Sequence, residues 1–122
     1  MTAPRVVVLA QDLIWGDRLA RTLEGAGATV TRAKTAPELD LALASSDAMV
    51  VDMTARAYDP LAAISRARAA GARVLAVGQH DDVELRKRAL ARGADKVLAY
   101  RKLFEDGPRT VAAWLGSTSK PS

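Results

Sequence analysis

Polar and small residues follow several short apolar runs of this sequence. The candidates that end or closely follow such runs are Gln11, Asp12, Asp52, Gly78, Tyr100 and Lys102. Carboxylates are ligands of hard cations such as Mg²⁺, so Asp12 and Asp52 are weak candidates for a metal site. The chain has no cysteine and His80 is its only histidine. Disulfides, thiolate sites and multi-histidine metal sites are therefore excluded, and carboxylate chemistry remains.

Five short segments have the patterns of β-strands. Residues 5–10, 48–52, 73–77 and 96–99 are largely apolar, as in buried strands, and residues 28–33 alternate between apolar and polar side chains. The segments between and after them carry apolar residues at helical spacing, which predicts helices over residues 12–26, 35–44, 59–70, 81–92 and 108–115. Asp12, Asp59 and Asp81 are expected to cap three of these helices. The Gly107-Pro108 break makes the last helix short and leaves Leu103 and Phe104 in a loop.

Alternation of strands and helices predicts an α/β fold with an all-parallel sheet covered on both faces. Five such units in this length indicate a flavodoxin-like, doubly wound (βα)5 three-layer sandwich with strand order 2-1-3-4-5. We expect residues 1–116 to form a single domain and residues 117–122 a flexible tail. In open sheets of this kind ligands bind beyond the carboxyl ends of the strands, where the polar candidates gather.

Composition limits the classes of partner. The 122 residues are 49% hydrophobic and 26% charged, which is typical of a globular domain. Residues 1–65 carry 6 Lys/Arg against 8 Asp/Glu, and residues 66–122 carry 12 against 6. The basic half is interleaved with acids and the whole chain is only 4% aromatic, which disfavours direct nucleic-acid binding and favours a protein partner. With neither a membrane-length apolar run nor a cleavable-signal pattern, we expect no membrane insertion and a cytoplasmic location.

Three segments resemble the receiver domain of bacterial response regulators, a family that includes the chemotaxis receiver. DAMVVDM is similar to the family's third strand, which ends in the phosphoacceptor aspartate. ARGADKVLAYRK is similar to its entry into the last helix, and EGAGATVTRAKTAPELDLAL to its second strand and flanking helices. The resemblance covers residues 4–115 and implies a signalling domain of two-component systems or phosphorelays, which is not an enzyme.

The resemblance implies a site of five parts: an acidic pair, the phosphoacceptor, a hydroxyl, a lysine and an aromatic ring. The carboxylates would hold Mg²⁺ during phosphoryl transfer. Asp52 occupies the phosphoacceptor position. The acidic pair falls on Ala10 and Gln11, or after a shift of one residue on Gln11 and Asp12, so at least one carboxylate is missing.

The remaining three parts also depart from the family. Gly78 stands at the hydroxyl position, Tyr100 at the lysine position and Val97 at the aromatic position. Arg101 replaces the family's proline, and Lys102 is the candidate for a displaced phosphate-binding lysine, with a surface charge as the alternative. These departures predict a degenerate or pseudo-receiver that binds proteins without phosphorylation and needs no cofactor.

Two other functions stay open. The first is a working phosphoreceiver that accepts phosphate on Asp52. The second is a flavodoxin-like domain that binds a small ligand or nucleotide, which the lack of a glycine-rich phosphate loop disfavours.

The resemblance also implies where a protein would bind. In the receiver family, partners or a second subunit contact the face formed by the fourth helix, the fifth strand and the last helix. The corresponding residues are Arg86, Lys87, Val97, Arg101 and Phe104. We expect a protein partner, a homodimer, or both, at this face, with a solvated basic surface as the alternative.

Overall fold

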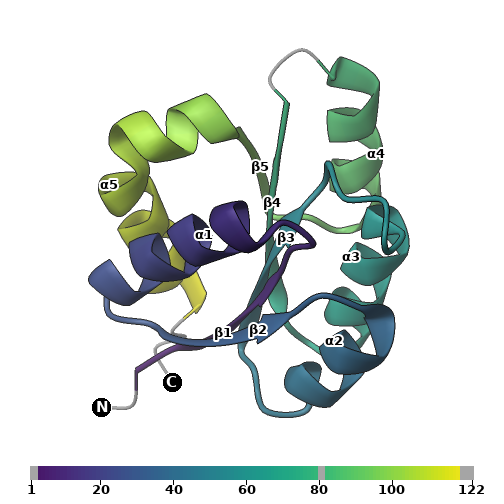
Figure 1. The fold of residues 1–122 in the computed structure, drawn as a ribbon, viewed down its shortest axis with the longest axis horizontal. Coiled ribbons are helices and arrows are strands. Elements are labelled where there is room, and N and C mark those ends of the chain that lie inside the picture. The colour runs from purple at the N-terminus through teal and green to yellow at the C-terminus, as the bar shows by residue number, and fades with distance from the viewer. Residues whose placement is uncertain (1–2, 80–81, 119–122) are drawn as a thin grey trace.

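The computed structural model of this chain describes residues 3–79 and 82–118 (Figure 1). Within these residues, five strands and five helices alternate. The strands are β1 (Arg5–Leu9), β2 (Thr29–Ala33), β3 (Ala48–Asp52), β4 (Arg73–Gly78) and β5 (Lys96–Ala99). The helices are α1 (Leu13–Gly25), α2 (Ala36–Leu43), α3 (Pro60–Ala69), α4 (Val83–Arg92) and α5 (Tyr100–Thr118). None of the helices in this described part is long and apolar enough to cross a membrane.

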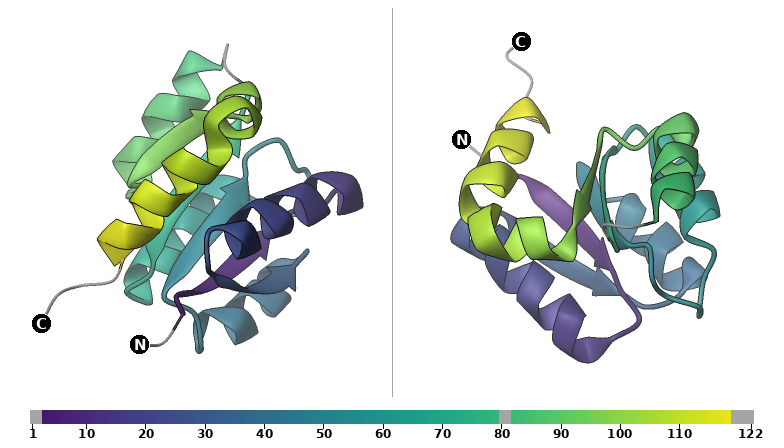
Figure 2. Two further views of the ribbon diagram at one scale, coloured as in Figure 1. Left: turned by 90° about the vertical axis from the view of Figure 1, so that its left-hand side faces the viewer. Right: turned by 90° about the horizontal axis from the view of Figure 1, so that it is seen from above.

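The strands form one parallel sheet in the order β2-β1-β3-β4-β5. Helices α1 and α5 cover one face of this sheet, and α2, α3 and α4 cover the other (Figures 1 and 2). This arrangement confirms the predicted flavodoxin-like three-layer sandwich and its strand order. The register aligns Leu9 with Val51, and Asp52 with Val77, so the carboxyl ends of the central strands meet at one edge.

The core has two apolar layers because successive strand residues point to opposite faces of the sheet. Val7, Met49 and their neighbours pack beneath α2, α3 and α4. Val8, Val50 and their neighbours pack beneath α1 and α5. The central strands β1 and β3 are therefore apolar on both faces, as expected for a covered parallel sheet.

Helix ends follow the local sequence. Asp12 and Asp59 accept hydrogen bonds from the first backbone N–H groups of α1 and α3, which confirms their predicted capping roles. The cap of α4 is Asp82, one residue after the predicted Asp81; Asp81 and His80 lie outside the described residues. α4 ends at Gly93, whose φ of 115° is in the left-handed region that glycine adopts without strain.

The last helix differs from the prediction. α5 begins directly after β5 and has non-helical backbone only at Asp106, so the expected loop around Leu103 and Phe104 is wrong. Leu103 is fully buried in the layer beneath α1 and α5, and this packing favours helix despite the Gly107-Pro108 break. Pro108 is tolerated because it opens the second half of α5, where a missing N–H is harmless.

The predicted end of the domain at residue 116 falls inside α5. α5 continues through Gly116 to Thr118, so the first two residues of the predicted tail 117–122 are helical. Residues 119–122 lie outside the described part of the chain.

Candidate functional site

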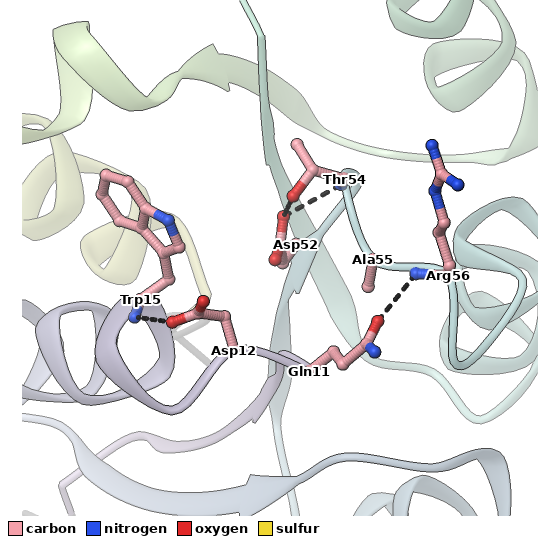
Figure 3. A pocket seen from close by; sticks show the side chains of 7 residues that line it. All are labelled: Gln11, Asp12, Trp15, Asp52, Thr54, Ala55 and Arg56. Carbon is pink, nitrogen blue, oxygen red and sulfur yellow. Dashed lines mark hydrogen bonds between the residues drawn. The ribbon is translucent and has the colours of Figure 1, made fainter.

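A pocket of about 520 Å³ lies beyond the carboxyl ends of β1 and β3 (Figure 3). Its lining residues are Gln11, Asp12, Trp15, Asp52, Thr54, Ala55 and Arg56. They come from the β1–α1 junction, the end of β3 and the segment that leads to α3. The sequence therefore predicted the location of the pocket correctly, because parallel strands bring their carboxyl ends to a common edge.

Asp52 is a buried carboxylate with few partners. The residue is only 1% exposed, and burial of a charge that lacks a partner is energetically unfavourable. The backbone N–H and the hydroxyl of Thr54 both donate to its Oδ1, at 2.9 and 2.7 Å. Among the described residues, no hydrogen bond reaches its Oδ2 and no cation forms an ion pair with it. The carboxylate therefore carries a charge that the protein does not neutralise.

Tyr100 stands beside Asp52, at the position where the resemblance implies a lysine. Burial, together with the negative charge of Asp52, raises the pKa of the Tyr100 hydroxyl above its usual value. The hydroxyl is buried and near the carboxylate, but the two groups do not meet the geometry of a hydrogen bond. A neutral phenol thus stands where the resemblance implies a lysine ammonium, so it does not offset the negative charge of Asp52.

Tyr58 is a second buried phenol near Asp52, and the sequence analysis missed it. Its hydroxyl donates to the backbone carbonyls of Asp52, at 2.7 Å, and Leu9, at 3.0 Å, which ties the end of β3 to β1. Burial and the Asp52 charge raise the pKa of this hydroxyl as well. A lone aromatic residue in the loop between β3 and α3 was the available signal.

Gln11 holds the loop that follows β3. Its Oε1 accepts hydrogen bonds from the backbone N–H groups of Arg56 and Ala57, at 2.8 and 3.0 Å. The side-chain oxygen is therefore occupied, and Gln11 acts as a structural strut on the pocket wall. The sequence analysis considered Gln11 as a cation ligand. Its Oε1 atom already accepts two hydrogen bonds, so it is not free for that role.

Asp12 combines a structural role with a place in the pocket. Its Oδ1 accepts from the N–H groups of Ile14 and Trp15, at 2.8 and 3.0 Å. Its Oδ2 has no hydrogen bond among the described residues. Ala10 is buried in the core and does not line the pocket, so the alignment that places the family's acidic pair on Gln11 and Asp12 agrees with the geometry.

The residues expected at the ends of β4 and β5 do not complete the site. Gly78 is buried outside the pocket, and a Cβ on it would lie 3.3 Å from the Met53 Cβ, so Met53 crowds the position expected to hold a hydroxyl. Lys102 is exposed and does not line the pocket. Within residues 3–79 and 82–118, no three acidic or histidine side chains are grouped so that they could hold a metal ion.

An aromatic cluster forms the wall between the pocket and α5. The Phe104 ring stacks on Trp15 at 5.4 Å and on Tyr100 at 5.7 Å between ring centroids, and the Trp15 and Tyr100 rings contact each other at 4.4 Å with an angle of 36° between their planes. The Arg18 guanidinium lies 4.2 Å from the centroid of Phe104 and 5.3 Å from that of Trp15. The sequence analysis did not connect these residues, because the cluster depends on the helical start of α5.

The predicted interaction face is only partly free. Arg86 of α4 donates to the backbone carbonyl of Val97 in β5 at 3.0 Å, and Arg101 pairs with Glu105 at 2.9 Å. Lys87 is exposed on α4. Phe104 stacks on Trp15 of α1, so its ring faces the opposite side of the sheet from α4.

Comparison with known proteins shows the fold. No family model matches the sequence, and no curated protein does either. Among solved structures, a two-component response regulator from Clostridium difficile is 17% identical, with a TM-score of 0.82 and 96% of this chain and 99% of that one covered. The signal receiver domain of the putative response regulator NarL from Mycobacterium tuberculosis is 23% identical, with a TM-score of 0.79 over 95% and 98% of the two chains.

A third structure has a modified aspartate. It is a response regulator from Burkholderia pseudomallei with a phosphorylated aspartic acid, calcium ion and citrate. That protein is 24% identical, with a TM-score of 0.72, and the match covers 93% of this chain and 71% of that one. At these identities the likeness establishes a shared fold, and function has to be argued from the site.

Proposed function

We propose that this chain is a receiver-like domain of two-component-type signalling that acts as a protein-interaction module without phosphorylation of Asp52. The single observation that carries the proposal is the surroundings of that carboxylate. Asp12 is the other carboxylate of the pocket lining, Tyr100 replaces the lysine, and Gln11 is tied to the loop. Phosphoryl transfer needs positive charge to stabilise the transferred oxygens. Arg56 is the one cation of the pocket lining, and among the described residues neither it nor any other cation forms an ion pair with Asp52.

Mg²⁺, which the receiver fold implies, would find a reduced set of anionic ligands in this pocket. The free carboxylate oxygens are Asp52 Oδ2 and Asp12 Oδ2, and the described residues offer no third acid beside them. Mg²⁺ gives up its hydration water reluctantly and depends on anionic ligands. We therefore assign no cofactor and no enzymatic step to the domain.

The alternative, a working phosphoreceiver, is favoured by one observation. Asp52 ends β3 at the pocket, and its Oδ2 has no hydrogen bond within the described residues, so it is the oxygen that a phosphoryl group would join.

Treatment with acetyl phosphate and Mg²⁺ distinguishes the two functions. We expect intact-protein mass spectrometry to show no phosphoryl adduct. We also expect that beryllofluoride with Mg²⁺ leaves the backbone amide signals in the ¹H–¹⁵N NMR spectrum unchanged. The Asp52→Asn variant is the matched control for adducts at other sites. A stoichiometric adduct on the unmodified sequence that is absent from this variant would establish the phosphoreceiver and overturn the proposal.

For the partner, we propose an acidic protein surface bound at the basic outer side of α4. Arg86, Lys87, Arg88 and Arg92 are exposed there, and like charges oppose the pairing of two such faces. We expect analytical ultracentrifugation at micromolar concentration to show a monomer. A dimer that the double charge reversal Arg86→Glu, Lys87→Glu dissociates would show instead that a second copy binds this face.

A further inference from the structure

We infer that the pocket beside Asp52 binds the positively charged end of a lysine or arginine side chain supplied by a partner protein. This inference goes beyond the interaction face on α4, because it assigns a ligand to the pocket beyond the carboxyl ends of β1 and β3. It depends on four features of the described residues: an unneutralised carboxylate, a second carboxylate, an apolar wall and an apolar rim.

The first feature is the Asp52 carboxylate. It is almost fully buried, Thr54 satisfies only its Oδ1, and no described cation pairs with it. The buried Tyr100 hydroxyl next to it also has no hydrogen-bond partner. A buried carboxylate that lacks a counter-ion is costly, and an entering ammonium or guanidinium group removes that cost by ion pairing and hydrogen bonding.

The second feature is the position of Asp12 across the pocket mouth (Figure 3). Its Oδ1 is fixed by the start of α1, which leaves Oδ2 as an acceptor for the same cation. Arg56 is the one cation among the lining residues, and its side chain extends from the far wall without an ion pair to Asp52. Two carboxylates repel phosphate and carboxylate ligands and attract a cationic group.

The third feature is the indole of Trp15, which lines the pocket next to the two carboxylates. Stacking on Phe104 and a tilted contact with Tyr100 hold this ring in place. Lysine and arginine present an apolar methylene stem behind a charged end, so a ring beside an anionic floor suits both parts of the side chain.

The fourth feature favours a protein over a free amine. Leu13 and Ile14, in the first turn of α1 beside Asp12, are 60% and 72% exposed. They are two of the five large apolar side chains that stand exposed in the described part of the chain. Exposed apolar side chains next to a buried polar anchor suit the water-excluding surroundings of an interface hot spot, and a small amine would leave them uncovered.

Titration with a short peptide tests the inference. The probe is N-acetyl-Leu-Lys-Leu-amide, followed by ¹H–¹⁵N NMR of the intact chain, and its control is the same peptide with norleucine in place of lysine. We expect saturable shifts of the Thr54 amide and the Trp15 indole N–H. The norleucine peptide, which lacks the charge, is expected to bind at least about thirtyfold more weakly.

Variants of the protein locate the binding. Asp52→Asn keeps an acceptor for Thr54 and removes the charge, so we expect the same loss of about thirtyfold. Asp40→Asn removes an exposed carboxylate on α2 that pairs with Arg66, outside the pocket, and should leave binding unchanged. Equal binding by the unmodified chain and Asp52→Asn would overturn the inference, and so would an equal loss in both variants.

Titration with n-butylammonium at matched ionic strength tests whether the pocket prefers a free amine or a side chain of a partner protein. We expect it to bind more weakly than the peptide, and the double substitution Leu13→Ser, Ile14→Ser to remove the peptide's advantage. Equal affinity for butylammonium and the peptide would assign the pocket to a free amine and overturn the protein partner. The outcome is separable from the proposed function, since all titrations use unphosphorylated protein and acetyl phosphate is tested independently.

Discussion

Raising the pH from 9 to 11 is expected to lower the free energy of unfolding by up to about 2.8 kcal/mol, about 1.4 kcal/mol for each of the two tyrosines. Burial and the charge of Asp52 raise the pKa values of Tyr58 and Tyr100 in the folded chain. The stability from the protonated phenols is therefore fully present below the unfolded pKa of about 10. It is lost above that pH because the unfolded chain then releases protons that the folded chain retains.

Urea unfolding at pH 9, 10 and 11 measures this loss, with absorbance at 295 nm reporting tyrosinate. The variants Tyr58→Phe and Tyr100→Phe should each remove about half of the pH dependence. The slope is compared rather than the absolute stability, because Tyr58→Phe also leaves two backbone carbonyls without their donor. Tyrosinate that forms in the folded protein with a midpoint near pH 10 would contradict the burial of both hydroxyls.

Asp52→Asn is expected to stabilise the fold by about 1–3 kcal/mol, the cost of a buried polar group that is left without its partner. The amide keeps an oxygen for the two Thr54 donors and removes a charge that has no counter-ion. Its NH₂ group also becomes a donor beside the Tyr100 hydroxyl, which has no hydrogen-bond partner. Most substitutions of a buried residue destabilise, so the sign itself is informative.

Thermal and urea unfolding at pH 7 measure the change. Asp52→Ala separates charge from hydrogen bonding, because it removes both the anion and the acceptor for Thr54, and it should stabilise less than Asp52→Asn. Asp40→Asn controls for net charge, since this exposed carboxylate already has the Arg66 guanidinium at 3.0 Å. If Asp52→Asn is instead less stable than the unmodified chain, the buried Asp52 charge does not destabilise the fold. That result would remove the basis for the cation pocket.

The sequence predicted the sheet because the apolar strand runs, the capping aspartates and the glycines after the helices are local signals. It failed at the start of α5. Tyr100, Leu103 and Phe104 are helical because they pack on α1 and the sheet, while the local sequence ends in a Gly-Pro break. Tertiary packing outweighs local propensity there, and no pattern in residues 100–107 records it.

The site was predictable only at the strand ends. Asp52 is the last residue of β3 and Asp12 is the third residue after β1, so the topology fixes them at one edge. Tyr58 and the role of Gln11 depend on the course of an irregular loop, whose hydrogen bonds join residues 45 to 49 positions apart. Contacts of that range follow from the folded backbone and leave no short spacing in the sequence.

The hydrogen bond from Arg86 to the Val97 carbonyl has a consequence for aggregation. β5 is an outer strand, and outer strands offer unpaired backbone groups on which a strand from another molecule can add. Here a guanidinium occupies one of those acceptors in a strand only four residues long. Addition of a strand from another molecule at β5 is therefore disfavoured.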